Sequence, residues 1–139
     1  MALSLEQKQL VQSTFEKVVP IADKAAELFY ARLFEIDATT QPLFVNTNMQ
    51  EQGKMLMRML ALAVKGLDNL DELVPQVEAL GKRHIGYGVK KEQYTSVGEA
   101  LIWTLGQGLG SDFTPEVKEA WIEVYTILAK VATEAAYTN

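Results

Sequence analysis

Apolar residues recur every three or four positions along almost the whole chain, and no segment shows a convincing two-residue alternation. This periodicity predicts helices throughout. The first helix is expected after Ser4, which forms a capping box with Gln7 three residues later, and Pro20 interrupts it. A second helix is expected to end near Ile36. It is apolar over much of its circumference, so it should be deeply packed.

The third expected helix has the cleanest apolar stripe in the chain. An irregular piece containing Pro42 precedes it, and Asn48, three residues before Glu51, is a suitable N-cap. Its expected inner face consists of Met55, Leu56, Met59, Leu60, Ala63, Val64 and Leu67.

Three more helices are expected downstream. Pro75 is placed in the first turn of the fourth, where its missing N–H costs little, and the fifth spans about residues 91–107. Thr114, Pro115 and Glu116 open the last helix as a cap, a proline at the first helical position and an acid suited to the helix dipole. With no internal repeat and no linker, the pattern predicts one all-α domain over residues 1–139.

Composition narrows the class of protein. The chain has 139 residues, of which 48% are hydrophobic and 22% charged, and it has no cysteine, which excludes disulfides and zinc–thiolate sites. A net charge of −5, from 13 basic and 18 acidic residues, disfavours nucleic-acid binding. The longest uncharged apolar run, Met59–Val64, is too short to span a membrane, and the N-terminus has no signal-peptide core. We expect a cytoplasmic protein.

His84 is the single histidine. It continues the apolar line of Leu73, Val77 and Leu80, so it should face inward. An isolated histidine on such a face is more often a core residue than a ligand. A zinc site needs three or four ligands, whereas haem needs one imidazole because the porphyrin supplies four nitrogens. Haem would be non-covalent, since the CxxCH motif is absent.

Two polar residues extend apolar stripes. Gln52 precedes the stripe of the third helix by one turn, and Tyr30 lies beside Leu33 and Phe34 on the second. Taken alone, Gln52 is a solvated residue of a first helical turn, and Tyr30 is a core tyrosine with a paired hydroxyl. Together they would bring two hydrogen-bond donors to an otherwise apolar cavity.

Six segments, in their order and spacing, carry a resemblance that covers nearly the whole chain. The chain resembles bacterial single-domain globins, of the type related to Vitreoscilla haemoglobin and to the globin domain of flavohaemoglobins. The resemblance implies a globin fold, in which three helices pack on three around a haem pocket. The segments are FYARLF (Phe29–Phe34), PLF (Pro42–Phe44), NL…P (Asn69–Pro75), H-x-x-x-G-V (His84–Val89), Y-x-x-V-G (Tyr94–Gly98) and AW…Y (Ala120–Tyr125).

The resemblance assigns site residues. It makes His84 the proximal iron ligand of a non-covalent haem b, and Phe44 the residue that packs flat on the porphyrin. Tyr30 and Gln52 match the distal residues that reach a ligand of the iron, and Leu56 matches the apolar residue beside the sixth coordination site. Further pocket walls are expected at Leu80, Val89, Tyr94, Val97 and Tyr125.

The chain departs from the flavohaemoglobin pattern at one position. In those globins a tyrosine and a glutamate support the proximal histidine, and Tyr94 occupies the tyrosine's place. The glutamate's place falls on Ala136, and Glu134, two residues earlier, lies about 200° round the helix. Without that carboxylate the imidazole should be less anionic, which weighs against peroxidase-like chemistry.

The resemblance therefore implies reversible, high-affinity binding of oxygen and other diatomic ligands, such as nitric oxide and carbon monoxide, in oxygen storage, sensing or transport. One donor to a partly charged ligand contributes roughly 1.5–3 kcal/mol, or about 10- to 100-fold slower release. The alternative is a nitric oxide dioxygenase served by a separate reductase. A third interpretation is a haem-free scaffold.

Overall fold

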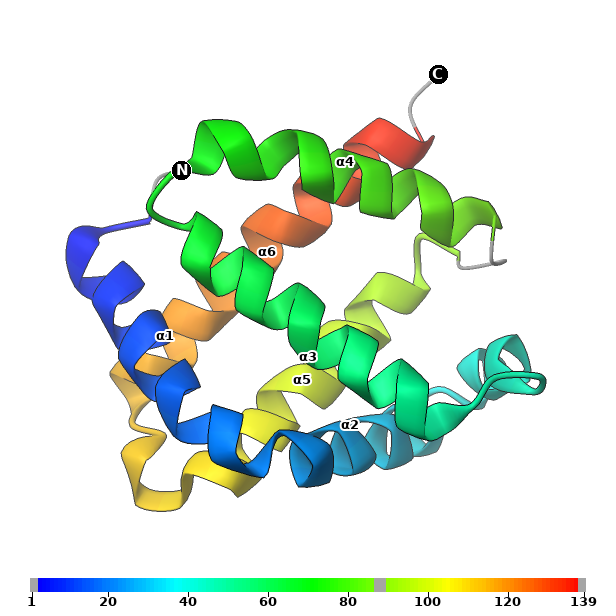
Figure 1. Ribbon diagram of the computed structural model, residues 1–139, viewed down its shortest axis with the longest axis horizontal. Helices are drawn as coiled ribbons and strands as arrows, with labels where there is room; N and C mark the ends of the chain where they lie inside the picture. Colours follow the sequence, from blue (N-terminus) through cyan, green and yellow to red (C-terminus); the bar gives the residue numbers. More distant parts are fainter. Residues whose placement is uncertain (1–2, 87–89, 138–139) are drawn as a thin grey trace.

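The protein is an assembly of helices (Figure 1). The computed structural model describes residues 3–86 and 90–137, with the backbone alone for residues 84–86 and 135–137. No strand occurs in these ranges, which confirms the all-α prediction. The elements are α1 (Leu5–Val18), η1 (Val19–Ile21), α2 (Ala22–Ile36), η2 (Ala38–Phe44), α3 (Met49–Gly66), α4 (Leu70–Gly86), α5 (Gln93–Leu109), η3 (Gly110–Asp112) and α6 (Pro115–Tyr137), where η denotes a short 3-10 helix.

The predicted caps explain where several helices begin. Ser4 Oγ accepts from the Gln7 backbone N–H at 3.0 Å, and the Gln7 side chain accepts from the Ser4 N–H at 3.2 Å, so the capping box is confirmed. Asn48 Oδ1 accepts two backbone N–H groups at the start of α3. Thr114 Oγ1 accepts from the Val117 N–H at 3.3 Å ahead of α6.

The helices form two levels in the view of Figure 1. There α1, α3 and α4 cross in front of α5 and α6, and α2 runs along the lower edge, where it packs against α3 and α5. Within the described ranges, no helix is long and apolar enough to cross a membrane.

The core has two parts. The main core is centred on Trp121, which is 1% exposed and donates its indole N–H to Thr14 Oγ1 at 2.9 Å. The smaller α4–α6 cluster consists of Leu73, Val77 and Ala132, and Leu128 packs against both parts. The main core includes Val11, Phe15, Phe29, Leu33, Val64, Leu101, Leu105, Trp121 and Val124.

Two details of the predicted pattern are wrong. Met55 was expected on the inner face of α3 but is 53% exposed. Gly53 faces α2, and Met55, two residues later, lies about 200° round the helix and therefore faces outward. Pro75 lies inside α4 rather than in its first turn, because the helix already begins at Leu70. The Asn69 carbonyl starts that helix earlier by accepting the N–H groups of residues 72 and 73.

Candidate functional site

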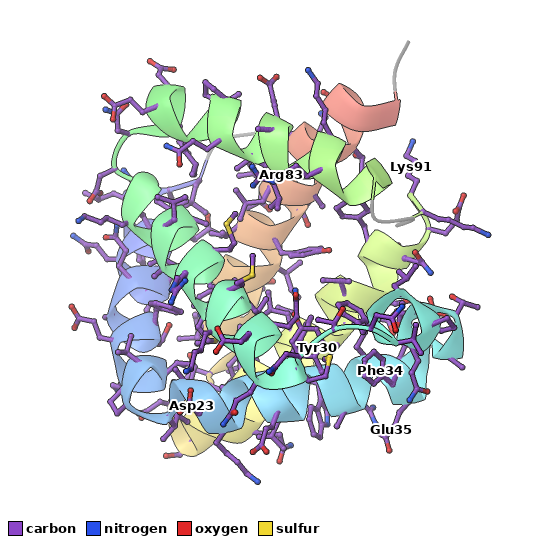
Figure 2. All side chains as sticks on the ribbon, turned by 45° about the vertical axis from the view of Figure 1, so that its right-hand side comes forward. Asp23, Tyr30, Phe34, Glu35, Arg83 and Lys91 are labelled. Atoms are coloured by element: carbon purple, nitrogen blue, oxygen red, sulfur yellow. The ribbon has the colours of Figure 1, made fainter. Side chains whose placement is uncertain are left out.

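Tyr30 and Gln52 meet in the structure, although they are 22 residues apart in sequence. Tyr30 lies on the inner side of α2 and is 8% exposed, whereas Asp23 and Glu35 of the same helix point outward (Figure 2). Gln52 Nε2 donates to the Tyr30 hydroxyl oxygen at 3.2 Å. Burial raises the pKa of Tyr30, and the hydrogen bond from Gln52 only partly opposes this rise. The hydroxyl therefore keeps its proton, and that proton is available to a third group.

A close crossing of α2 and α3 brings the pair together. A Cβ added at Gly53 would lie 2.9 Å from the Cβ of Ala26, closer than two side-chain carbons approach each other. Glycine at this position allows the two backbones to come near each other immediately beside Gln52. A larger residue at Gly53 would force this crossing to shift, and we expect the shift to disturb the neighbouring bond from Gln52 to Tyr30.

Three phenylalanines surround the Tyr30 ring. Its centroid lies 4.9 Å from that of Phe29, 5.4 Å from that of Phe44 and 6.2 Å from that of Phe34. Phe44 is the last residue of η2, so this short helix brings the predicted porphyrin-packing residue against the predicted distal tyrosine. The structure therefore places Tyr30, Gln52 and Phe44 together.

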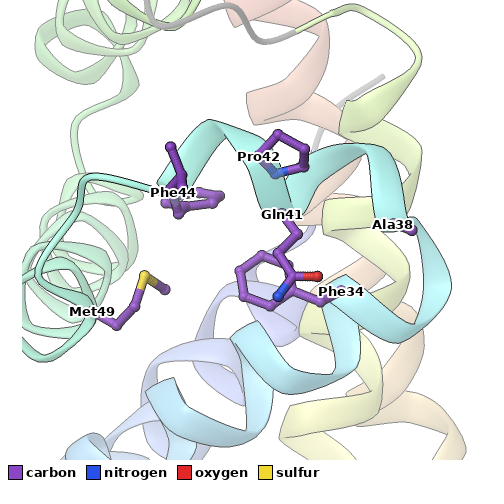
Figure 3. Close-up of a pocket in the computed structure, with 7 residues that line it drawn as sticks. Phe34, Ala38, Gln41, Pro42, Phe44 and Met49 are labelled. Carbon is purple, nitrogen blue, oxygen red and sulfur yellow. The ribbon is translucent and has the colours of Figure 1, made fainter.

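A hollow of about 530 Å³ lies beside Phe34 and Phe44 (Figure 3). It shares Phe44 with the predicted haem site, whereas Tyr30, Gln52 and Leu56 do not line it. Its walls are Phe34, Ala38, Gln41, Pro42, Phe44, Val45 and Met49.

The predicted inner faces of three helices change from buried to partly exposed toward one end. In α3, Val64 is buried but Leu56 is partly exposed; in α4, Val77 is buried but Leu80 is partly exposed. In α5 the buried line reaches Leu101, and the predicted wall residues Val97 and Tyr94 before it are partly exposed. The start of α3, the end of α4 and the start of α5 all lie on the right-hand side of Figure 1. These helices thus leave apolar side chains incompletely covered on one side of the molecule, which suits a large apolar cofactor.

The comparison with protein families identifies the family to which this chain belongs. The family model described as "Globin" matches residues 27–132, which is most of the chain. The chain belongs to the globin family. As a globin it has the globin fold, and membership of this family implies a haem-binding protein.

Flavohemoproteins and neuroglobins are among the relatives of this globin. The flavohemoprotein of Halalkalibacterium halodurans is 32% identical over 132 residues, which cover 93% of this chain and 32% of that protein. The flavohemoprotein of Bacillus subtilis is 27% identical over 123 residues, which cover 87% of this chain and 31% of that protein. Neuroglobin-1 of Oncorhynchus mykiss is 29% identical over 139 residues, covering 91% of this chain and 87% of that protein. The chain spans about a third of the length of the flavohemoproteins it matches.

The backbone of His84 lies in the last turn of α4 of this globin. Its side chain, like the whole of Val89, lies outside the described residues. Three residues before His84, a Cβ added at Gly81 would lie 2.3 Å from the Ala132 carbonyl oxygen, so α4 and α6 are in backbone contact there. This contact fixes the end of α4 against α6. Glu134 of α6 is exposed, and the side chain of Ala136 lies outside the described ones.

Tyr125 fastens α6 to the start of α5. Its hydroxyl donates to the Tyr94 backbone oxygen at 2.5 Å, and its ring lies against Gly98, where an added Cβ would be 2.7 Å from the ring. Burial raises the pKa of Tyr125, and the neighbouring Tyr94 raises it further. The hydroxyl is thus occupied by the backbone, and only the ring of Tyr125 is left to serve as the predicted wall.

Sequence reasoning missed one residue at the edge of this region. Gln93 is 5% exposed and hydrogen-bonds both to η2 and to the segment before α5. It stands in a polar run between Glu92 and Tyr94, and nothing in that run distinguishes a buried amide from a solvated one.

Proposed function

We propose that this globin binds haem b non-covalently through His84 and binds oxygen and other diatomic ligands reversibly and with high affinity. Haem, when bound, supplies an iron with a coordination position free for such a ligand. The residues assigned to hold it are His84 on α4, Phe44 on η2 and the partly exposed apolar side chains Leu56, Leu80 and Val97. The apolar character of these side chains fits a porphyrin. The ring of Phe44 also packs against the ring of Tyr30.

The single observation that carries the proposal is the geometry of Tyr30. Its oxygen already accepts a hydrogen bond from Gln52, and its proton has no acceptor among the described residues. A buried donor with nothing to donate to is costly unless a ligand accepts its proton. A ligand that gains negative charge on binding, as oxygen does, is the acceptor that benefits most.

The size of this effect supports slow release. A hydrogen bond to a partly charged acceptor in a site shielded from water contributes roughly 1.5–3 kcal/mol, which is about 10- to 100-fold in a dissociation rate. Tyr30 is only 8% exposed, with the rings of Phe29, Phe34 and Phe44 packed around its own ring. Gln52 holds the hydroxyl oxygen from the other side, so the donor is oriented before a ligand arrives.

Reversible binding is tested by equilibrating the reduced haem-loaded protein with graded oxygen. The expected result is a spectral change that is complete at low oxygen and reverses fully when oxygen is removed. Irreversible oxidation, or no spectral change, contradicts the proposal.

The match to flavohemoproteins favours a second function, conversion of nitric oxide to nitrate with a separate reductase. This reaction needs a reducing equivalent after each turnover, and the region in common covers only about a third of those relatives. Adding a flavin reductase and its reductant to the oxygenated protein separates the two functions. Sustained consumption of nitric oxide supports the enzyme, and a single stoichiometric conversion supports the oxygen binder.

A further inference from the structure

A polar link joins η2 to the beginning of α5. Gln93 is the first residue of α5, and its side-chain oxygen accepts from the Lys90 backbone N–H at 2.8 Å. Its side-chain nitrogen donates to Thr39 Oγ1 at 3.1 Å and, at a longer 3.4 Å, to the Thr39 carbonyl oxygen. One buried amide therefore holds two segments that are 54 residues apart in sequence.

A second bond reinforces the same junction. Ser96 Oγ, in the first turn of α5, donates to Asp37 Oδ2 at 2.8 Å. The other oxygen of Asp37 accepts from the backbone N–H of Thr39 at 3.1 Å and from the Thr39 hydroxyl. Both cross-links run from donors on α5 to acceptors at the start of η2. They therefore hold η2 against the first turn of α5.

Both linked segments carry residues predicted for the haem site. η2 ends at Phe44, and the first turns of α5 carry Tyr94 and Val97. A residue that only capped α5 would need the bond to Lys90 alone. The bond from Gln93 Nε2 to Thr39 is additional, and it joins α5 to η2 rather than capping the helix.

We propose that Gln93 is a positioning residue that sets the spacing between the start of α5 and η2, and so slows the escape of haem. This inference rests on the proposed function. An uncharged amide suits the role because one end accepts and the other donates. It also lies in a buried position, where an unpaired charge would be costly.

The first test measures haem transfer from the loaded protein to an excess of another apoglobin. Gln93→Met keeps the length of the side chain but loses both bonds. Gln93→Glu keeps an oxygen for the Lys90 N–H but turns a second oxygen toward Thr39. Gln93→Met is expected to lose haem about 5- to 50-fold faster, as two net hydrogen bonds imply, and Gln93→Glu, which loses only the bond to Thr39, should also lose haem faster. The matched control is Gln76→Met on the exposed face of α4, whose amide donates only within its own helix and whose loss should leave the rate unchanged.

The second test uses backbone amide exchange in the haem-free chain. Loss of the link should speed exchange in residues 38–45 while exchange in α1, remote from the link, stays unchanged. Thr39→Ala, at an exposed position, breaks the same bond from the other side and should show the same pattern if a Gln93 variant fails to fold.

Three results overturn the inference. Equal acceleration of exchange in η2 and α1 would make Gln93 a general support of the fold. Faster exchange in η2 with wild-type haem transfer would show a link without a role in haem retention. A wild-type protein that takes up no haem would remove the proposed function itself, and this outcome is recognised before any variant is compared.

Discussion

Replacing Tyr30 with phenylalanine tests the distal site most selectively. The change removes one hydroxyl and keeps the ring that packs against Phe29 and Phe44. The oxygenated protein loses one oriented donor, which contributes roughly 1.5–3 kcal/mol to a partly charged acceptor. Oxygen release should therefore become about 10- to 100-fold faster. The acceleration should be near 10-fold if Gln52, freed from its bond to Tyr30, turns its own N–H toward the ligand.

The assay is stopped-flow displacement of oxygen by excess carbon monoxide. Carbon monoxide release itself serves as an internal reference, because this ligand gains less charge on binding and should respond much less. Removing both donors, with Tyr30→Phe and Gln52→Leu in one chain, should exceed the effect of either change alone. The pair is in contact, so the two effects are not expected to add.

A matched control is Tyr125→Phe, which also removes one hydroxyl from a largely buried tyrosine. That hydroxyl donates to the Tyr94 backbone oxygen, so its loss should lower the free energy of unfolding by about 0.5–1.5 kcal/mol and leave oxygen release nearly unchanged. The reasoning is refuted if Tyr30→Phe leaves oxygen release unchanged, or changes oxygen and carbon monoxide release by the same factor.

Three further results are expected. Gly53→Val should speed oxygen release although it replaces neither Tyr30 nor Gln52. The crossing with Ala26 leaves no room for a side chain, so the valine should shift α3 and disturb the Tyr30–Gln52 pair. An unchanged stopped-flow release rate in the folded variant would contradict this. Trp121→Phe should lower the free energy of unfolding in urea by about 2–3 kcal/mol, since it leaves a cavity and removes the indole hydrogen bond to Thr14 Oγ1, and a loss well under 1 kcal/mol would count against Trp121 as the centre of the core. The rate of oxygen release should stay constant from neutral pH toward 10.0. Burial raises the pKa of Tyr30 above that value, and the hydroxyl stops donating only as the pH rises through the raised pKa. A change in the release rate well below pH 10.0 would mean that Tyr30 ionises there.

The helices were predictable from sequence, whereas their crossings were not. Apolar periodicity located the six long helices of the described residues, and the caps at Ser4, Asn48 and Thr114 marked three of the starts. The start of α4 was misplaced because a proline suits a first turn but does not require one. Met55 was misplaced because a helical stripe shows the apolar face and not the point at which α2 meets it.

In the candidate site, too, the residues were predictable from the sequence but the contacts that bring them together were not. The resemblance assigned Tyr30, Gln52 and Phe44 to one site. In the structure Tyr30 contacts both Gln52 and Phe44. What makes that contact is the absence of a side chain at Gly53, which sequence alone does not distinguish from any other helical glycine. Gln93 was missed because its partner Thr39 is 54 residues away, and pairing over that distance depends on the finished fold.

The central claim is that this chain binds haem through His84, and one imidazole is enough to hold the iron because the porphyrin supplies the other four nitrogens. The most direct test is the absorption spectrum of the purified protein after haem addition, with His84→Ala measured beside it. We predict one haem per chain and an intense Soret band that the substitution abolishes or reshapes, and that added imidazole restores. A wild-type protein that takes up no haem, or a His84→Ala spectrum identical to that of the wild type, would contradict it.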